Sequence, residues 1–275
     1  MRGIEMKLFV GLLLVASGIV AVWGFKARPA LTDDNTAPFV PGAGPVPVMV
    51  ELFTSEVCSS CPPADVLLSK LDQQPINGVD IIVLSEHVDY WNSLGWQDPF
   101  SSADFSQRQT VYGDAFRNGS VYTPQMVVDG QQQFVGSDEK RAHAAVIKAA
   151  KEARAKVELQ MTSSKEPAAK LSINITNLPQ VTANDTAEVL LAITESNLLS
   201  NVARGENAGR SLTHTAVVRQ LQTVGEVAAG SNSFTADATL PFNTAWRKEN
   251  LRIVVFIQER RTRRVLGAAS LKVSA

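Results

Sequence analysis

Hydrophobic and polar positions divide the chain into three stretches with different patterns. From Leu8 to Phe25 nearly every residue is apolar. From about 47 to 156, short apolar runs alternate with stretches in which apolar residues recur every three to four positions, as strands and helices do. From Val157 onward, short alternating runs are separated by turn residues. The pattern therefore predicts an N-terminal apolar segment, an α/β region and an all-β region.

The N-terminal apolar segment has basic residues on both sides. As a helix, residues 8–25 would extend over ~27 Å, which is marginally enough to cross a bilayer. A secretory signal has the same order of charge and apolar core. We therefore expect residues 1–26 to be a cleaved signal peptide or an inner-membrane anchor. Either one makes the rest of the chain extracytoplasmic, periplasmic or secreted, after a proline-rich and glycine-rich linker at 27–46.

The α/β region, residues 47–156, is expected to form one domain. Its first half reads as strand, helix, strand, because a continuous apolar run with β-branched residues is typical of a buried parallel strand. The expected elements are a strand at 46–53, a helix after residue 61, a strand at 79–84, a helix at 103–116, a hairpin of strands at 125–128 and 132–135, and a helix ending near 153.

The all-β region, residues 157–275, is expected to form a second domain. Short strands at regular spacing with turn signals between them are typical of a β-sandwich. The expected strands are 157–161, 171–176, 188–194, 212–221, 233–240, 251–258 and 265–273.

Composition limits the classes of partner. The 275 residues are 45% hydrophobic and 19% charged, which is enough apolar material for a packed core. The net charge of −1 provides no general basic field, so we expect no nucleic-acid partner.

The two cysteines of the chain lie together, in Cys58-Ser59-Ser60-Cys61, at the predicted junction of a strand and a helix. A Cys-x-x-Cys at such a junction is typical of reversible dithiol–disulfide chemistry. The helix dipole favours a thiolate at Cys58, the predicted nucleophile, and Cys61 is the predicted resolving thiol. A structural disulfide is an alternative, although so small a loop removes little unfolded-state entropy.

Three further residues are predicted to join the cysteines. Pro124 opens a strand, where a cis bond would bring backbone beside the pair; the alternative is an ordinary proline at a strand start. Glu51 is a candidate proton shuttle for Cys61, or a solvent-facing carboxylate. His87 follows a predicted parallel strand, so it is expected at the same sheet edge as Cys58; a surface or structural histidine is the alternative.

A copper site is the alternative chemistry for the same residues. Soft thiolate ligands suit Cu(I), and Cys58, Cys61 and His87 would be its ligands. Thiol exchange itself requires no cofactor.

Two loops carry unusual composition. Asp89 to Phe100 is rich in aromatic residues and is expected either to shape a substrate groove or to pack between domains. The polar, glycine-rich Arg204–Arg210 is expected either to contact a partner or an anionic group, or to be an ordinary sandwich loop.

The segment from Val50 to Ser55, leading into Cys58-Ser59-Ser60-Cys61-Pro62-Pro63, resembles the active-site strand and helix of the thioredoxin superfamily. The motifs VELFTSEVCSSCPPAD, HVDYW, LGWQDPF, VYTPQMVVDG and RGENAGR are similar to a secreted bacterial thioredoxin-like family of unknown function, number twelve twenty-three. This resemblance extends from about Val48 to the C-terminus. It implies an α/β thioredoxin-like domain followed by an all-β sandwich-like domain, with Pro124 as the cis-proline, and it implies no substrate.

The chain departs from thioredoxin itself at three places. Val57 stands where thioredoxin has a tryptophan, and Ser59-Ser60 replaces Gly-Pro. Glu51 lies seven positions before Cys58, one more than the acidic strand residue of thioredoxin. The reduction potential of thioredoxin therefore does not carry over.

The sequence predicts an extracytoplasmic thiol–disulfide oxidoreductase. Its substrate would be a protein or small-molecule thiol or disulfide, with an unidentified redox partner and N-terminal membrane association. The alternatives are a periplasmic copper-binding or chaperone protein and a non-catalytic interaction module in which the cysteines are incidental.

Overall fold

The structure is a computed structural model that describes residues 44–74, 76–163, 168–228 and 230–273. The predicted signal or anchor, and all but the last residues of the predicted linker, lie outside the described residues. Among those residues, no helix is long and apolar enough to cross a membrane. Strands account for 43% and helices for 19% of the described residues.

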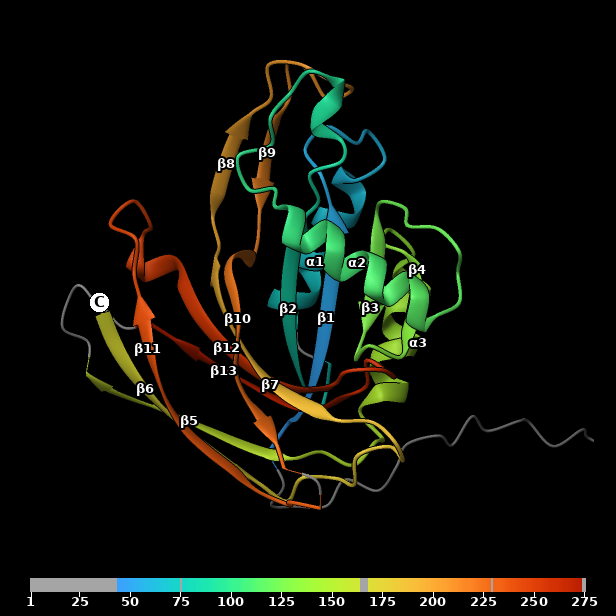
Figure 1. The fold of residues 1–275 in the computed structure, drawn as a ribbon. Helices are drawn as coiled ribbons and strands as arrows, with labels where there is room; N and C mark the ends of the chain where they lie inside the picture. The colour runs from blue at the N-terminus through green and yellow to red at the C-terminus, as the bar shows by residue number, and fades with distance from the viewer. Residues whose placement is uncertain (1–43, 75, 164–167, 229, 274–275) are drawn as a thin grey trace, which may run out of the picture. The chain divides into compact units, whose positions relative to one another are not determined.

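A mixed eight-stranded sheet organises the fold (Figure 1). Its strand order is β13-β12-β7-β10-β2-β1-β3-β4. The pairs β1–β2 and β2–β10 are parallel, and the other neighbours are antiparallel. The strands are β1 (Val46–Thr54), β2 (Val79–His87), β3 (Gln125–Val128), β4 (Gln132–Val135), β7 (Ala187–Glu195), β10 (Val217–Val227), β12 (Leu251–Glu259) and β13 (Val265–Lys272).

The remaining elements surround this sheet (Figure 1). A three-stranded sheet has the order β11-β6-β5, and β8 and β9 form a two-stranded ribbon. Their bounds are β5 (Lys156–Ser163), β6 (Ala168–Thr176), β8 (Leu198–Asn201), β9 (Ser211–His214) and β11 (Phe234–Pro241). The helices are α1 (Pro62–Gln73), α2 (Ala103–Ala115) and α3 (Glu139–Ala149), with short 3-10 turns at η1 (Asn92–Leu94) and η2 (Lys248–Asn250).

Side chains of β1 alternate between two covered faces of the sheet, as the pleat of a strand requires. Val48, Val50 and Leu52 pack with buried residues of α1 and α3. Met49 packs with Phe105 of α2, on the opposite face. Helix α1 and helix α2 therefore cover opposite faces of β1, and the two faces offer a β1 side chain different neighbours.

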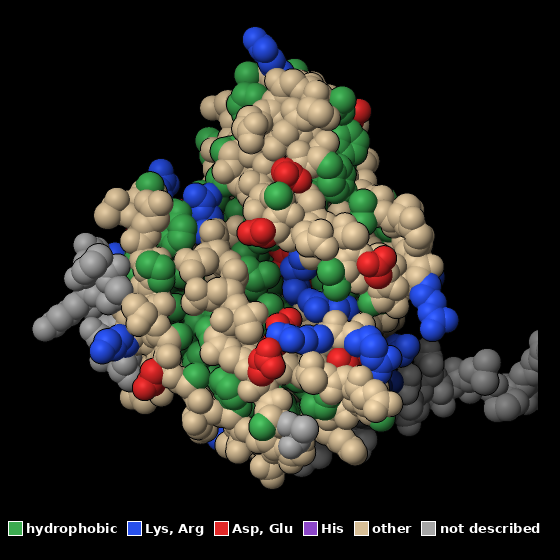
Figure 2. Space-filling model, in the orientation of Figure 1, with side chains coloured by type: hydrophobic (Ala, Val, Ile, Leu, Met, Phe, Trp, Pro, Cys, Tyr) green, Lys and Arg blue, Asp and Glu red, His purple; other side chains and the backbone are tan. Residues whose placement is uncertain are grey.

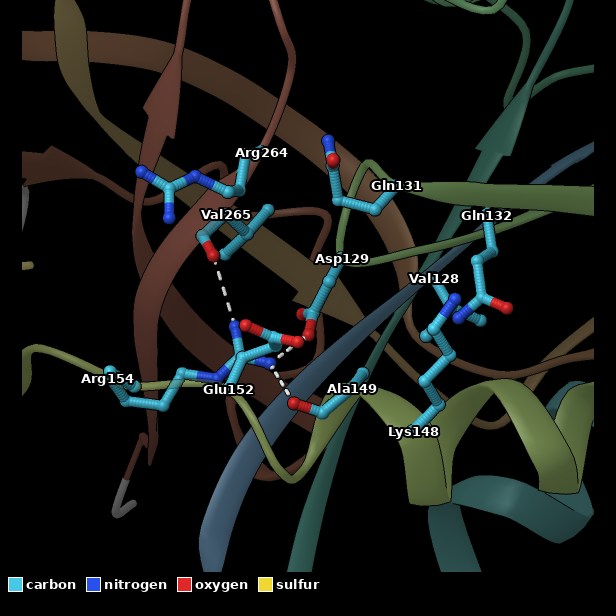
Figure 3. A pocket seen from close by; sticks show the side chains of 11 residues that line it. Val128, Asp129, Gln131, Gln132, Lys148, Ala149, Glu152, Arg154, Arg264 and Val265 are labelled. Atoms are coloured by element: carbon cyan, nitrogen blue, oxygen red, sulfur yellow. Dashed lines mark hydrogen bonds and ion pairs between the residues drawn. The ribbon is translucent and has the colours of Figure 1, made fainter. Parts of the chain in front are cut away.

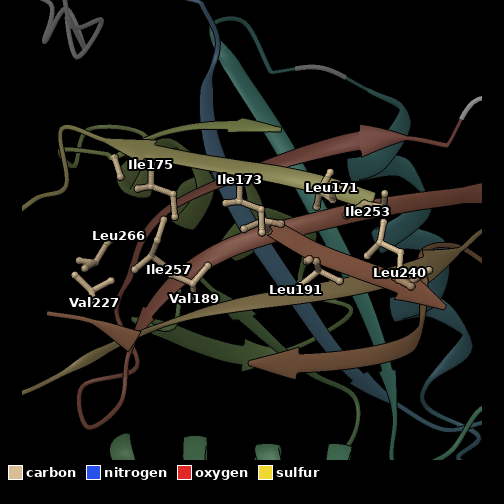
Figure 4. Close-up of a cluster of buried hydrophobic side chains, with 14 of the residues drawn as sticks. Leu171, Ile173, Ile175, Val189, Leu191, Val227, Leu240, Ile253, Ile257 and Leu266 are labelled. Carbon is tan, nitrogen blue, oxygen red and sulfur yellow. The ribbon is translucent and has the colours of Figure 1, made fainter. Parts of the chain in front are cut away.

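The other half of the large sheet is also covered on both faces. In β7, Val189 and Leu191 pack against the three-stranded sheet, in the cluster shown in Figure 4. Leu190 points the other way, into a core shared with Met49 and Leu84 of β1 and β2. Residues of both halves of the sheet thus bury one another. Each Å² of apolar surface removed from water in this way stabilises the fold by ~25 cal/mol.

The predicted fold, an α/β thioredoxin-like domain followed by a separate all-β sandwich, is wrong. The decisive contact is between β10 and β2, where Val217 pairs in parallel with Ser85 and the Ser85 amide donates to the Ala216 carbonyl at 2.9 Å. Strands from both halves of the chain therefore share one sheet. Most strands were predicted by their periodicity, but the predicted strand 212–221 is two strands of different sheets, β9 and β10. Periodicity does not identify the partner of a strand.

Candidate functional site

Cys58 and Cys61 form a disulfide just before α1, with their Cα atoms 5.4 Å apart. Cys61 is the N-cap residue, and its carbonyl accepts hydrogen bonds from the amides of Ala64 and Asp65 at 2.8 and 3.1 Å. Prolines occupy the first two helical positions, where an amide hydrogen would have no intrahelical partner. The sequence thus starts the helix at the second cysteine and holds the pair at its N-terminus.

Solvent does not reach either cysteine in this state, although the two serines between them are exposed. A loop that is distant in the sequence packs against the motif. Asn207 Nδ2 donates to the carbonyls of Glu56 and Cys58, each at 2.9 Å, and the Ser59 amide donates to Glu206 Oε2 at 2.9 Å. The polar loop Arg204–Arg210 of the sequence analysis is therefore part of the cysteine site.

A buried polar cluster begins where β1 and β2 end. Thr54 and His87 are register partners at the last positions of the two parallel strands. Thr54 Oγ1 donates to Asp65 Oδ1 on α1 at 2.9 Å. His87 Nδ1 lies 2.8 Å from Asp98 Oδ2, and that carboxylate also accepts from the Glu56 amide at 2.9 Å. The cluster thus connects both strands, helix α1 and the aromatic segment 89–100.

A second histidine completes the cluster. The ring of His214, at the end of β9, lies edge-on to that of His87 with centroids 4.9 Å apart, and Phe100 contacts both rings. His214 Nε2 is 3.2 Å from Glu56 Oε1, and Trp96 Nε1 donates to the other Glu56 oxygen at 2.7 Å. His87 Nε2 and His214 Nδ1 are buried and have no hydrogen-bond partner among the described residues.

Burial and the charges within this cluster shift the pKa values of Asp65, His87 and Asp98. Burial raises the pKa of Asp65 to about 6, although the nearby His87 and His214 and the bond from Thr54 oppose the rise. Burial lowers the pKa of His87, but Asp98 and the other carboxylates outweigh it, so the pKa is raised overall. For Asp98 burial raises the pKa, and His87 reverses that to a net lowering. The raised pKa of His87 and the lowered pKa of Asp98 both favour the charged forms of this pair, while the pKa of Asp65 lies above its ordinary value, at about 6.

The predicted site residue Pro124 lies beside the helix of the cysteines. The Thr123–Pro124 peptide bond is cis. A Cβ added to Gly136 would lie 3.0 Å from Ala64 Cβ on α1 and 3.1 Å from Pro124 Cβ, so these side chains face the same small space. The structure thus brings Pro124 to the first turns of α1.

Glu51 is not brought to the cysteines. Its carboxylate accepts from Arg108 Nε at 2.7 Å and from the Tyr112 hydroxyl, both on α2, which covers the face of β1 opposite α1. Burial, together with the charge of Glu51, holds the pKa of the adjacent Glu86 well above its usual range, despite Arg108. This buried network joins β1, β2 and α2 rather than serving the disulfide.

His87 lies at the predicted sheet edge, paired with Asp98. The described residues contain no group of three or more His, Cys, Asp and Glu side chains placed to hold a metal ion. Both sulfurs are bonded to each other in this form. The copper alternative stays an untested prediction.

Several residues of the site were not predicted as such from the sequence, among them Asp65, Asp98 and His214. The helical position of Asp65, one turn after Cys61, was a usable signal, because side chains four residues apart share a helix face. The others come from loops and strand ends far along the chain, which no local pattern connects to the cysteines.

A cavity of about 260 Å³ lies away from the cysteines (Figure 3), lined by residues that include Asp129, Lys148, Arg154 and Arg264. Arg154 is already held by Asp129 and by the carbonyls of Ala149 and Val265. Figure 2 shows basic and acidic side chains intermingled on one face of the molecule. Three basic and two acidic side chains line the cavity, and two of the basic ones, Arg154 and Arg264, are paired with carboxylates.

Comparison with known proteins identifies the family. A family model described as "Protein of unknown function (DUF1223)" matches residues 49–258. The chain belongs to this family. No curated protein matches the chain.

Two solved structures are similar to this DUF1223 protein over most of its length. Protein AGR_C_4864 from Agrobacterium tumefaciens is 28% identical, with a TM-score of 0.65 over 84% of this chain and 96% of that chain. HBP35 of Porphyromonas gingivalis is 14% identical, with a TM-score of 0.56 over 84% of this chain and 76% of that chain. The second likeness shows the fold alone.

Proposed function

We propose that this protein is a thiol–disulfide oxidoreductase whose reactive group is the Cys58–Cys61 pair. The observation that carries the proposal is a disulfide at the N-terminus of a helix, next to a polar cluster in which the pKa of the Asp65 carboxyl is raised to about 6. Thiolates are stabilised at helix N-termini, and perturbed titrations gather at functional sites. A structural disulfide needs no such cluster.

The proposed reaction begins with the reduced protein. The Cys58 thiolate attacks one sulfur of a substrate disulfide, and the other substrate sulfur leaves as a thiolate. Cys61 then loses its proton and attacks the Cys58 sulfur, which breaks the mixed disulfide and releases the second substrate thiolate. Two electrons pass from the dithiol to the substrate. The reverse sequence, with an incoming thiolate attacking Cys58, transfers a disulfide to the substrate.

Asp65 is the proposed proton acceptor for Cys61, in place of Glu51. Its amide bonds the Cys61 carbonyl at 3.1 Å, and its carboxylate is bonded to Thr54, four residues before Cys58. A general base works best when its pKa lies near the operating pH, and the pKa of Asp65 is about 6. In the reverse direction the same carboxyl group returns the proton to the departing Cys61 thiolate.

An extracytoplasmic location belongs to the same proposal. Disulfides persist in oxidising compartments, and the N-terminal apolar segment has the order of charges expected for export. Protein or small-molecule thiols outside the cytoplasm are the substrate class. The CxxC motif lies between a strand and a helix, and from this position we infer the dithiol–disulfide exchange chemistry of the thioredoxin superfamily.

Trapping the mixed disulfide tests the proposal. Cys61→Ser, reduced and then mixed with oxidised glutathione, should accumulate one glutathione on Cys58, removable by dithiothreitol and visible by intact mass. Cys58→Ser is the matched control, and should form the adduct far more slowly. Equal adduct formation on both variants, or none on either, would contradict the proposed roles.

A further inference from the structure

The cysteine site is closed by a lobe from the other half of the chain. Two backbone hydrogen bonds close this lobe at Val202: its amide donates to the Arg210 carbonyl at 3.0 Å, and its carbonyl accepts from the Gly209 amide at 2.8 Å. Residues 202–210, which we call the cap, therefore form a self-contained lobe on the β8–β9 ribbon. The bonds that close it are internal to the segment, apart from those it makes to the cysteine motif.

The cap holds the cysteine motif through two side chains, the carboxamide of Asn207 and the carboxylate of Glu206, which bond to backbone groups as a peptide would. Arg210 Nη1 donates to Asn207 Oδ1 at 2.8 Å, which fixes the carboxamide so that its Nδ2 donates to the two backbone carbonyls of Glu56 and Cys58. Glu206 Oε2 accepts from the Ser59 amide. Side chains of the cap thus satisfy two backbone acceptors and one backbone donor around the nucleophile.

Reaction at Cys58 conflicts with this closed arrangement. Cys58 and Cys61 are each 0% exposed, so an incoming sulfur has no approach to either one. Asn207 is itself 1% exposed, and Gly205 lies so close to Val57 that an added Cβ would be 2.8 Å from the Val57 side chain. Some part of this contact has to open before exchange.

We propose that the cap is displaced by a polypeptide substrate, whose backbone takes over the bonds that Asn207 and Glu206 make in the closed state. This rests on the proposed function of the cysteine pair. The groups uncovered by the cap are two carbonyls and an amide hydrogen, which an extended chain satisfies with its own amide and carbonyl groups. A small thiol brings no such groups, so it reacts only with the fraction of molecules that are already open.

Paired glycine variants test the cap. In Gly205→Ala, the new Cβ meets Val57 and the backbone has a φ of +82°, so the closed cap is disfavoured. Gly78→Ala is the control: its φ is +77° with nothing within 4 Å, in the turn before β2. The measurement is the rate at which dithiothreitol reduces the protein's own disulfide, followed by alkylation and intact mass. Gly205→Ala should raise this rate about tenfold, and Gly78→Ala should change it less than about twofold.

A milder variant guards against misfolding. Glu206 is exposed to solvent in the cap, and Glu206→Gln weakens one charge-assisted bond to Ser59, so the rate should rise about threefold. Glu152→Gln, at an exposed glutamate near the end of α3, is its control. If Gly205→Ala and Glu206→Gln both stay within about twofold of wild type, the cap does not limit access and the inference is overturned.

A second arm tests the substrate class. Reduced, unfolded ribonuclease should reduce the wild-type disulfide faster than dithiothreitol does at equal thiol concentration. In Gly205→Ala the ratio of these two rates should fall, because mainly the rate with dithiothreitol rises. Equal acceleration with both thiols would refute displacement by polypeptide. These rates concern the protein's own disulfide and need no turnover, so they can succeed or fail separately from the trapping test of the proposed function.

Discussion

Asp65→Asn is the substitution with the most distinctive expected effect. Asp65 is partly buried, and its raised pKa favours the neutral form, so the folded state is penalised when the pH forces ionisation. Asparagine keeps the shape and keeps an oxygen to accept the bond from Thr54, but it never ionises. The variant should therefore be more stable than the wild type at alkaline pH, while losing the proton acceptor proposed for Cys61.

The expected gain in the free energy of unfolding follows from the shift in the pKa of Asp65. A pKa raised from 3.8 to about 6 corresponds to ~3 kcal/mol in the free energy of unfolding. The penalty is absent below pH 3.8, grows as the pH rises from 3.8 to 6, and is constant above 6. Asp65→Asn should accordingly gain up to ~3 kcal/mol over wild type at pH 8, and the two proteins should be almost equally stable near pH 3.5.

Urea unfolding of the oxidised proteins at pH 3.5 and pH 8 measures this difference. Asp80→Asn is the control, because Asp80 is exposed on β2 and a surface substitution usually changes stability by less than ~0.5 kcal/mol. If Asp65→Asn is no more stable than wild type at pH 8, the raised pKa of Asp65 is refuted.

Three further substitutions test other parts of the site. Asp98→Asn removes the carboxylate that pairs with His87 and should lower the free energy of unfolding by about 3–5 kcal/mol at pH 7. This loss should shrink in acid, where the wild-type carboxylate is protonated, and urea unfolding at several pH values measures it. Gly136→Ala should lower stability by ~1–3 kcal/mol, because the new methyl group meets Leu52 at 2.7 Å. Gly113→Ala is its control and should not lower stability, because its new methyl group has no contact under 3.7 Å; calorimetry compares the two variants. Glu51→Gln should destabilise by about 3–5 kcal/mol yet change the rate of glutathione trapping on Cys58 less than twofold; a tenfold slower rate would assign Glu51 to the reaction.

The sequence allowed most elements to be placed, because their periodicity is strong. Helix α1, for example, has its predicted apolar face buried at Ala64, Leu67, Leu68 and Leu71. The cysteine pair and the cis bond before Pro124 were also reached from local signals. The β8 strand was missed, since its four residues carry little pattern.

Glu51 shows why side-chain direction was beyond reach. Every residue of β1 from Val48 to Thr54 is buried, so hydrophobicity does not alternate along the strand and does not mark which face a residue occupies. Only the packing of α1 and α2 on opposite faces decides that Glu51 points away from the cysteines. The loop of Asn207 stood out by its composition, but nothing in the sequence connected it to Cys58, 149 residues earlier.

The reduction potential of the Cys58–Cys61 couple distinguishes an exchange catalyst from a structural disulfide. The protein is equilibrated in glutathione buffers of known ratio, quenched and alkylated, and the dithiol fraction is read by intact mass. We expect a reversible two-electron transition between about −120 and −270 mV, the range of exchange catalysts. A couple that stays oxidised to below about −300 mV would mark a structural disulfide and contradict the proposed function.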